Sequence, residues 1–505
     1  MTHPVQAAQQ AHGAVLADAA KQGMIENRHR LRLADFFCRN WALRAGLTRA
    51  PSLPSLTMRV LILAEDCNPD WPSLPIVGYQ MVKSLSRVAR VTLATHVRNR
   101  PQLCDQLPDT EVVFIDNEYV AAPLHKLATW VRRGNQANWS AAVAAAYPGA
   151  IAFDHEVYKH FKTRLESGGF DVVHRLTPMS PALPSPMASW SPVPFVLGPL
   201  NGGLEWPPEF RAELIRERET LRKLRHFYKL LPYHASTFRD SAAILASFAH
   251  TLADMPVSAR ERCIDFPEVG VAPELFQHPG ERPERSQLVF INVGRFVPLK
   301  LLDVAIRVFA ASPKLRQHKL VLVGDGMERP ALEQLVAELG LQQVVEFAGW
   351  MNQASVAARL READVFFFPS IRELGGGVVV EAMGCGCVPV VVNYGGPGGL
   401  VAGHDCGVAV ELGSKEQLVP RCVEVLERYV DDRELRLRHS RAAYARAIQH
   451  FAWDAKARKV MEVYEWVMGR RSFKPSFGEN GPPSSSVSGA ARSGAAEQVA
   501  RGQVA

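Results

Sequence analysis

Two glutamates bracket a glycine loop in the second half of the chain. Glu373 and Glu381 are eight positions apart, and three glycines, Gly375–Gly377, lie between them. The glycines let a ligand approach the backbone closely, and a helix start beyond them suits a phosphate. One carboxylate can accept two hydrogen bonds from a ribose diol, and the other can reach a sugar hydroxyl. The pattern indicates a phosphate-bearing sugar ligand; the alternative is acidic residues that only complement a helix dipole.

The loop must be positioned by the elements around it. The apolar run 365–369 predicts a buried strand, residues 378–383 a helix, and residues 388–392 a second buried strand. In this strand–loop–helix–strand unit, Glu381 lies about one turn into the helix. Its side chain can therefore point back towards the loop.

Two cations follow another apolar strand, predicted over 288–294. Arg295 and Lys300 come directly after Gly294, and a helix is predicted over 302–311. Arg295 offers a planar fork of donors and Lys300 a mobile point charge, so together they can clamp a diphosphate. They would stabilise a leaving diphosphate where charge develops, a task that a metal ion would otherwise perform. We therefore predict no metal and no cofactor, although such a pair on a loop usually has no function.

The two motifs resemble those of glycosyltransferase family four, the large retaining group-one family with the GT-B fold. From Glu373 to Val391 the chain has ELGGGVVVEAMGCGCVPVV, similar to E-x-F-G-x-x-x-x-E-A-M-A-x-G-x-P-V-V. The loop after Gly294 is similar to G-R-x-x-x-x-K-G. The resemblance covers roughly residues 58–468 and is stronger in the second half. It implies an α/β architecture with two facing Rossmann-like doubly wound parallel-sheet domains and an interdomain cleft.

The resemblance also implies roles for individual residues. Arg295 and Lys300 would hold the diphosphate, Glu381 the ribose and Glu373 the donor sugar. The backbone at Gly294, Gly376 and Gly377 would complete this part of the site. Trp350 follows a strand predicted over 344–347, where the family places the nucleotide base. Trp350 would stack on the base, and the alternative is a tryptophan packed in the core.

Further candidates lie in the first half of the chain. His174 ends a strand that resembles the family's D-V-V-H-x-H, with Leu176 in place of the second histidine. It would orient an acceptor or a donor phosphate, or serve the structure only. Asn201 and Gly202 follow the next strand and would line the cleft. Gly78, in the loop expected after the first strand, stands where family members often carry two glycines.

These patterns predict six segments. They are an N-terminal extension with a basic amphipathic helix (1–57), an N-terminal Rossmann-like domain on the acceptor side (58–276), a linker (277–287), a C-terminal Rossmann-like domain on the donor side (288–450), a helix that crosses back to the first domain (451–470) and a disordered tail (471–505).

Composition limits the class of protein. The chain has 505 residues, 47% of them hydrophobic and 22% charged, with a net charge of +7. This composition fits a globular protein with two or three domains. No apolar run approaches the ~18 residues of a membrane span, and no signal peptide is recognised. The scattered cysteines indicate reduced thiols, so we expect a cytoplasmic protein.

The basic helix expected within residues 21–49 offers three interpretations. Arginines alternate there with apolar residues, which is typical of a helix on a membrane surface, of one packed on its own domain, or of one that binds a partner. The first interpretation places the protein peripherally at the inner face of the membrane. No nucleic-acid partner is predicted.

The function implied is transfer of a sugar from a nucleoside diphosphate sugar to a hydroxyl of a glycan or glycolipid acceptor, with retention. Departures from the family pattern at Leu176, Leu301 and Gly375 favour one rival, a scaffold with a degraded site. A nucleotide-sugar epimerase with the same fold is a second. A phosphorylase-like enzyme lacks a recognisable cofactor lysine, and no G-x-G-x-x-G supports a dehydrogenase.

Overall fold

The computed structural model describes residues 58–123, 139–216, 227–280 and 284–477. These residues belong to one compact unit that begins at Met58. The predicted helix within 21–49, part of the predicted linker and residues 478–505 of the tail predicted over 471–505 lie outside the described residues. Residues 471–477 are described, and the Phe477 ring packs against Phe266, so this part of the predicted disordered tail is ordered.

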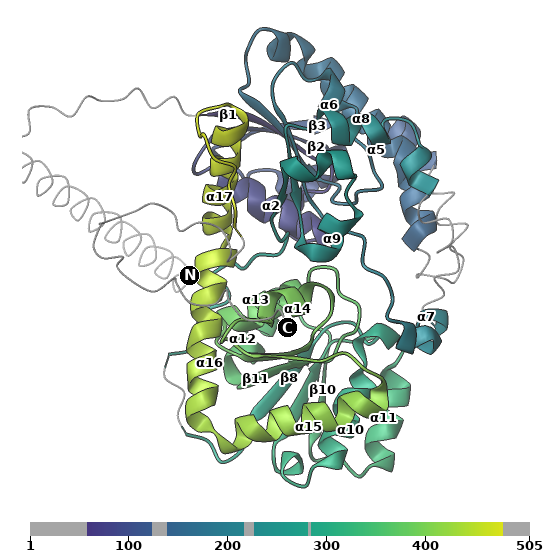
Figure 1. Cartoon of the computed structure of the whole chain (residues 1–505), viewed down its shortest axis with the longest axis vertical. Helices are drawn as coiled ribbons and strands as arrows, with labels where there is room; N and C mark the ends of the chain where they lie inside the picture. Colours follow the sequence, from purple (N-terminus) through teal and green to yellow (C-terminus); the bar gives the residue numbers. More distant parts are fainter. Residues whose placement is uncertain (1–57, 124–138, 217–226, 281–283, 478–505) are drawn as a thin grey trace, which may run out of the picture. The chain divides into compact units, whose positions relative to one another are not determined.

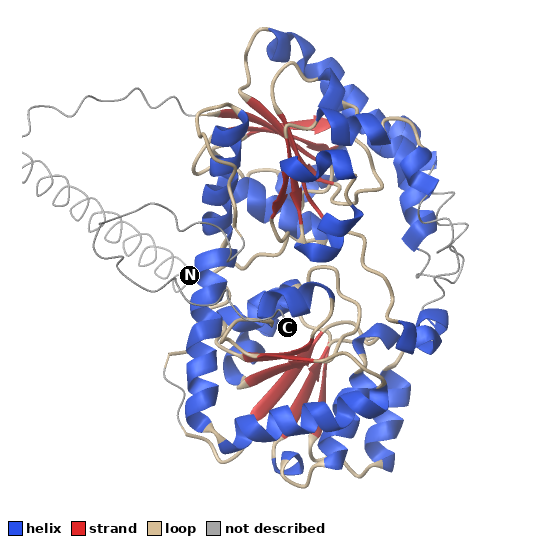
Figure 2. Cartoon of the chain, viewed as in Figure 1, coloured by secondary structure: helices blue, strands red, loops and turns tan. Residues whose placement is uncertain are grey.

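Seven parallel strands form the first sheet, in the order β3-β2-β1-β4-β5-β6-β7 (Figure 2). Their bounds are β1 Arg59–Ala64, β2 Arg90–His96, β3 Glu111–Ile115, β4 Val172–Thr177, β5 Phe195–Leu200, β6 Ala243–Ala246 and β7 Cys263–Asp265. The strand order reverses direction between β1 and β4. In a doubly wound sheet, ligands bind beyond the carboxyl ends of the strands at such a point.

Helices cover both faces of this sheet (Figure 1). Val60 and Ile62 of β1 pack towards α2 and α17, whereas Leu61 and Leu63 pack towards α5, because successive side chains of a strand point to opposite faces. The helices of this half, with the last helix of the chain, are α2 Leu74–Leu85, α3 Arg100–Leu103, α5 Trp139–Glu166, α6 Met187–Trp190, α7 Arg211–Arg216, α8 His234–Asp240, α9 Phe248–Asp254 and α17 Trp453–Val467.

Six parallel strands form the second sheet, in the order β10-β9-β8-β11-β12-β13. Their bounds are β8 Val289–Val293, β9 Lys319–Val323, β10 Val345–Gly349, β11 Val365–Phe368, β12 Val388–Val392 and β13 Val408–Val410. The central strands β8, β11 and β12 are almost entirely buried and apolar, as expected for a parallel sheet covered on both faces.

The helices of the second sheet are also divided between its faces. Phe290 and Phe367 pack towards α10, α11 and α15, whereas Ile291 and Phe368 pack towards α12, α13 and α14. The helices are α10 Leu302–Ala311, α11 Arg329–Glu338, α12 Gln353–Glu362, α13 Gly377–Gly384, α14 Gly395–Val401, α15 Lys415–Asp431 and α16 Arg433–Arg446. Trp206 and Phe210, from the connection between β5 and β6, belong to the core beside α10.

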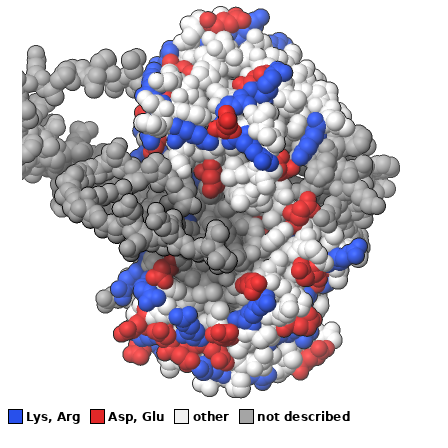
Figure 3. Space-filling view, in the orientation of Figure 1, with Lys and Arg blue, Asp and Glu red and all other residues white. Residues whose placement is uncertain are grey.

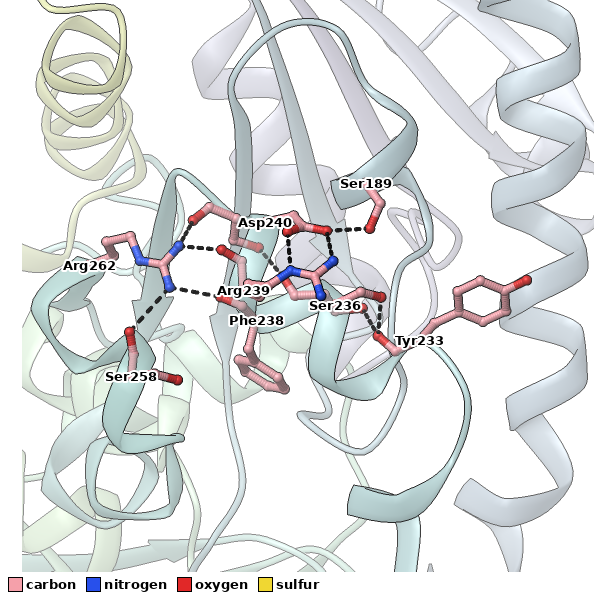
Figure 4. A network of polar contacts seen from close by, with 10 residues as sticks. Ser189, Tyr233, Ser236, Phe238, Arg239, Asp240, Ser258 and Arg262 are labelled. Atoms are coloured by element: carbon pink, nitrogen blue, oxygen red, sulfur yellow. Dashed lines mark hydrogen bonds and ion pairs between the residues drawn. The ribbon is translucent and has the colours of Figure 1, made fainter.

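An arginine network fixes the end of α8 beside β6 and β7 (Figure 4). Arg262 donates to four backbone carbonyl oxygens, those of Phe238, Arg239, Ser241 and Ser258. Asp240 accepts from the Arg239 guanidinium at 2.7 and 2.8 Å and from the Ser189 hydroxyl at 2.6 Å. Because the last carbonyls of a helix have no partners within the helix, Arg262 satisfies groups that would otherwise need water.

Several elements differ from the sequence predictions. The sequence placed Gly78 in a loop, but α2 begins at Leu74, since Pro75 supports a helix start there, and Gly78 lies inside this helix. The Gly-rich stretch 395–399 begins helix α14, which is largely buried. Between residues 209 and 231 the described elements are 3-10 turns at Pro208–Phe210 and Phe227–Leu230 and the helix α7. Strand β7 was not predicted.

Charged residues of both signs are interspersed on the described part of the face in Figure 3. This distribution is compatible with the small net charge of +7. None of the described helices combines the length and apolar composition needed to cross a membrane.

Candidate functional site

Lys300 and Glu373, predicted separately from two motifs, are in direct contact. Lys300 Nζ lies 2.5 Å from Glu373 Oε1, with the side chains only 10% and 20% exposed. The Lys300 ammonium also lies 4.5 Å from the centre of the Phe368 ring, the last residue of β11. The Ser370 hydroxyl donates to Glu373 Oε1 at 3.0 Å. The structure thus joins the loops that follow β8 and β11 at the carboxyl edge of the second sheet.

The glycine loop between these elements is held closely by its neighbours. Gly376 precedes α13 with φ of 77°, a left-handed conformation that suits glycine. Gly396 N donates to the Glu373 carbonyl oxygen at 2.9 Å, and a Cβ on Gly396 would overlap the Gly375 carbonyl oxygen. The backbone of α14 therefore supports the loop directly. Helix α13 begins at Gly377, so the first N–H groups of this helix, which have no partner within the helix, lie at the loop.

Arg295 lies on the loop after β8 and has an exposed side chain. Beside it, Gly294 faces Lys300, since a Cβ on Gly294 would lie 3.4 Å from Lys300 Nζ. Gly294 N donates to the Val323 carbonyl oxygen at 2.9 Å, and Phe296 N donates to the Asp325 carbonyl oxygen at 2.9 Å. These backbone hydrogen bonds hold the loop against the end of β9. The loop after β8 thus carries the exposed guanidinium of Arg295 and the nearly buried ammonium of Lys300.

Glu381 lies in the second turn of α13 and is half-buried. Burial raises the pKa of its carboxyl to about 7, because the charged form loses hydration. Such a carboxyl carries a proton for part of the time near neutral pH. A ligand that donates two hydrogen bonds to it would favour the carboxylate.

Trp350 is 76% exposed and follows β10 at the same edge of the second sheet. The alternative that it is packed in the core is therefore wrong. An exposed indole at a strand end is available to stack on a nucleotide base, and this role stays a prediction.

Two departures from the family pattern have structural explanations. Leu301 replaces a glycine and adopts φ 46° and ψ 45°, so the chain keeps the left-handed conformation at this position. Its side chain is buried in the core beside α10, which offsets a strain of about 1–3 kcal/mol. Leu176, at the position of the second histidine, is fully buried on the α2 face of the first sheet.

His174 is buried in the first sheet with both ring nitrogens engaged. Its Nε2 donates to the Gly198 carbonyl oxygen at 2.6 Å, so its Nδ1 must accept from the Tyr464 hydroxyl, also at 2.6 Å. Burial lowers the pKa of His174 to about 4, and the ring is neutral at pH 7. This geometry favours the structural alternative, and we do not retain His174 as a catalytic residue.

Replacing Tyr464 by phenylalanine should test that interpretation. The change leaves the buried His174 Nδ1 without a donor, so we expect a loss of about 1–3 kcal/mol in unfolding free energy. Urea unfolding measures this loss, and turnover by the folded variant should stay unchanged. A variant of normal stability that loses turnover would contradict the structural role.

The other first-half candidates have different surroundings. Gly78 packs in α2, where a Cβ would overlap the Asp66 carbonyl oxygen, so the prediction that it lies in a ligand-binding loop is wrong. Gly202 exchanges hydrogen bonds with Thr251, whose hydroxyl accepts from Gly202 N at 3.2 Å and donates to Gly202 O at 2.9 Å. Asn201 donates its side-chain amide to Glu268.

Glu268 is the residue that the sequence analysis missed. It is 4% exposed, and a Cβ on Gly375 would overlap its Oε1. Glu268 therefore reaches the glycine loop and Asn201 is bonded to Glu268, whereas Gly78 and His174 do not contact the loop through any hydrogen bond among the described residues. Two signals were available: an acidic residue in an otherwise apolar stretch, Phe266–Val271, and its place directly before residues 269–276, which resemble the family's interdomain crossing.

Comparison with known families bears on the second sheet. The family model described as glycosyl transferases group 1 matches residues 275–446. This part of the chain therefore resembles a group 1 glycosyltransferase domain. The match includes the Arg295 loop, the Lys300–Glu373 pair and the whole of α13, and it confirms the resemblance drawn from the sequence.

Curated relatives match over a similar length. The D-inositol 3-phosphate glycosyltransferase of Streptomyces avermitilis is 34% identical over 203 residues, 36% of this chain and 41% of that protein. The enzyme of the same name from Thermomonospora curvata is 33% identical over 190 residues, 36% of this chain and 43% of that protein. The chain therefore spans less than half of the length of these curated relatives.

Solved structures resemble the chain over most of its length. Sucrose-phosphate synthase from Thermosynechococcus elongatus has a TM-score of 0.56 at 16% identity, covering 82% of this chain and 100% of its own. HepE from Anabaena, in complex with UDP, has a TM-score of 0.53 at 18% identity, covering 80% and 99%. Together with the two parallel sheets, these likenesses confirm the predicted GT-B fold.

Proposed function

We propose that the group 1 domain works in a retaining glycosyltransferase that moves a sugar from a nucleoside diphosphate sugar to an acceptor hydroxyl. The observation that carries this proposal is the contact of Lys300 with Glu373 beneath the glycine loop. A cation and a sugar-binding carboxylate meet there at a helix start, and Arg295 is exposed on the adjoining loop. A diphosphate and a sugar ring need these groups at adjacent positions.

The residues suggest how the reaction would proceed. The bond between the anomeric carbon and the diphosphate oxygen breaks, and the acceptor oxygen forms a new bond on the same face of the sugar. The leaving diphosphate takes the proton of the acceptor hydroxyl. Arg295 and Lys300 stabilise the negative charge that develops on the diphosphate, where fixed cations act most strongly. Within the described ranges, no three His, Cys, Asp or Glu side chains are grouped for a metal ion, and metal independence stays a prediction.

The acceptor is proposed to be a glycan or glycolipid. The curated relatives above are named D-inositol 3-phosphate glycosyltransferase, and HepE was solved in complex with UDP, so UDP is the first nucleotide to test. Peripheral attachment to a membrane through residues 21–49 remains part of the proposal. Its support is the alternation of arginines with apolar residues in the sequence, since residues 21–49 lie outside the described ranges.

The affinity for a nucleoside diphosphate should rise with pH through the titration of Glu381. With a pKa of about 7, the carboxylate fraction increases about tenfold between pH 6 and pH 8. Because the proton favours the folded state of this raised carboxyl, the ligand-free protein loses the corresponding stability as pH rises from 4.5 to 7. Titration calorimetry at pH 6, 7 and 8 measures the effect.

Glu381→Gln is the control for this pH dependence. It keeps the shape of the side chain but cannot titrate. The increase in nucleotide affinity between pH 6 and pH 8 should then shrink to the part caused by ionisation of the phosphate itself. Equal pH profiles in both proteins would remove Glu381 from the nucleotide site.

The proposed function is tested by product analysis. The full chain is incubated with UDP-, GDP- and dTDP-sugars and a set of glycan and glycolipid acceptors, and nucleoside diphosphate release is followed. NMR of the product should show the anomeric configuration of the donor. An inverted product would contradict the retaining route, and a changed sugar released without acceptor would favour the epimerase.

A further inference from the structure

Two acceptor oxygens without donors belong to Asn201 and Glu268, the bonded pair that reaches the glycine loop through Glu268. Asn201 donates Nδ2 to Glu268 Oε1, while Asn201 Oδ1 and Glu268 Oε2 have no hydrogen-bond partner among the described residues. Glu268 is 4% exposed, so water reaches its carboxyl poorly. Buried polar atoms are rarely left unpaired in a folded protein, and each such atom costs about 1–3 kcal/mol.

The nearest hydroxyl does not satisfy the free carboxylate oxygen. Ser247 Oγ accepts from Glu268 N at 3.0 Å and donates to the Phe266 carbonyl oxygen at 3.2 Å. At these distances Ser247 gives its one proton to the Phe266 carbonyl oxygen, although its hydroxyl is close enough to the Glu268 carboxyl to lower the pKa that burial raises. Lys456 Nζ, which is also buried, donates to the Pro267 carbonyl oxygen and lies 3.9 Å from the centre of the Phe266 ring. Burial lowers the pKa of Lys456 and raises that of Glu268, and Lys456 makes no direct bond to the Glu268 carboxyl.

The same carboxyl occupies the space above the glycine loop. A Cβ on Gly375 would overlap Glu268 Oε1 and would lie 2.8 Å from Val269 Cγ1. An aromatic residue is common at this position in the family that the loop resembles. In this chain the glycine makes room for Glu268, so a carboxylate and an amide take the place of a ring beside the loop.

We propose that Asn201 Oδ1 and Glu268 Oε2 accept hydrogen bonds from the hydroxyls of a sugar ring, and that this pair selects the sugar. The inference rests on the proposed function. Glu373 belongs to the same loop as Gly375, and Glu268, which is bonded to Asn201, would be overlapped by a Cβ on Gly375, so a sugar at the loop has acceptors from both elements within reach. The ring belongs to the donor or to the acceptor, since both carry hydroxyls.

The test separates the sugar from the nucleotide. Calorimetric titrations of the full chain compare the affinity for UDP with that for UDP-glucose, and the affinity for GDP with that for GDP-mannose. Each comparison is made for wild type, Glu268→Gln and Asn201→Ala. Glu268→Gln keeps the side-chain shape but can place donors where an acceptor is needed. Both variants should weaken binding of the nucleotide sugar about 10- to 100-fold and change that of the free nucleotide by less than about twofold.

Asn117→Ala is the matched control. Asn117 is another buried amide with an unpartnered oxygen, and it donates to the Gly149 carbonyl oxygen at 2.9 Å, in the α5 region. Its loss should lower the melting temperature without changing the ratio of the two affinities. Melting curves of all variants show whether each protein is folded.

Each result decides the proposal. Weaker binding of the nucleotide sugar alone assigns the pair to the donor sugar. Unchanged donor binding with a KM for the acceptor raised about tenfold or more assigns it to the acceptor hydroxyls. If folded variants change neither, the inference is wrong while the proposed function stands. If wild type binds no nucleotide or nucleotide sugar, both fail.

Discussion

Replacing Lys300 by alanine should lower the rate of sugar transfer by about 10²–10³-fold, the cost typical of losing a group that stabilises transition-state charge. The ammonium is nearly buried, 2.5 Å from Glu373 Oε1 and over the Phe368 ring, so solvent cannot replace it easily. Steady-state kinetics with saturating donor measure the loss, which should appear mainly in kcat.

Lys314→Ala is the control for this prediction. Lys314 forms an ion pair of similar length, 2.6 Å to Asp431 Oδ2, but both side chains are well exposed. Removing it should cost at most about 1 kcal/mol of stability and leave the rate unchanged. A Lys300→Ala protein that is folded and transfers sugar at the wild-type rate would show that Lys300 does not stabilise the leaving diphosphate.

Replacing Gly375 by alanine should damage both stability and activity. The added methyl overlaps Glu268 Oε1 and approaches Val269 Cγ1, and the Gly375 carbonyl oxygen is already in close contact with Gly396. The loop cannot move away freely, so we expect a loss of about 1–3 kcal/mol in unfolding free energy. The displaced loop should lower kcat/KM by about 10²-fold, since small misplacements of binding groups are costly.

The matched control is Gly149→Ala. Gly149 lies inside helix α5, and a Cβ there meets no atom within 4 Å. Alanine is favoured over glycine by about 0.5–1 kcal/mol in a helix, so this variant should be as stable as wild type or more stable. Denaturant unfolding and kinetics compare the two variants. Equal behaviour would mean that the contact between Gly375 and Glu268 does not constrain the loop.

The second sheet was predicted well because its signals are local. Short apolar runs bounded by glycines fix buried parallel strands, and α10 and β12 have the predicted bounds. Arg295, Lys300, Glu373 and Glu381 were found from their spacing together with the family resemblance. Their direct contacts were not, since pairing of Lys300 with Glu373 depends on how strands far apart in the sequence are ordered in the sheet.

The first half was harder for physical reasons. His174 has a residue type that suits catalysis, but its burial and its bond to Tyr464 come from α17, 290 positions further along the chain. Glu268 directly precedes residues 269–276, which resemble the family's interdomain crossing, but its importance depends on contacts with Asn201 and Gly375 that this motif does not indicate. Gly78 was misplaced because a helix start at Pro75 competed with a loop.

The most direct test of the nucleotide site is a thermal shift experiment with UDP, GDP, dTDP, CMP and NAD. It compares wild type with Glu381→Ala and Arg295→Ala, and Glu424→Ala on the exposed face of α15 serves as control. A ligand at ~100 times its Kd stabilises the folded state by about 2.7 kcal/mol.

We predict a shift of wild type with one nucleoside diphosphate. The shift should persist in Glu424→Ala and be reduced or absent in Glu381→Ala and Arg295→Ala, each of which should lose about 1–3 kcal/mol of binding free energy. Full shifts in both site variants, or no shift of wild type with any nucleoside diphosphate, would contradict the assignment of the site.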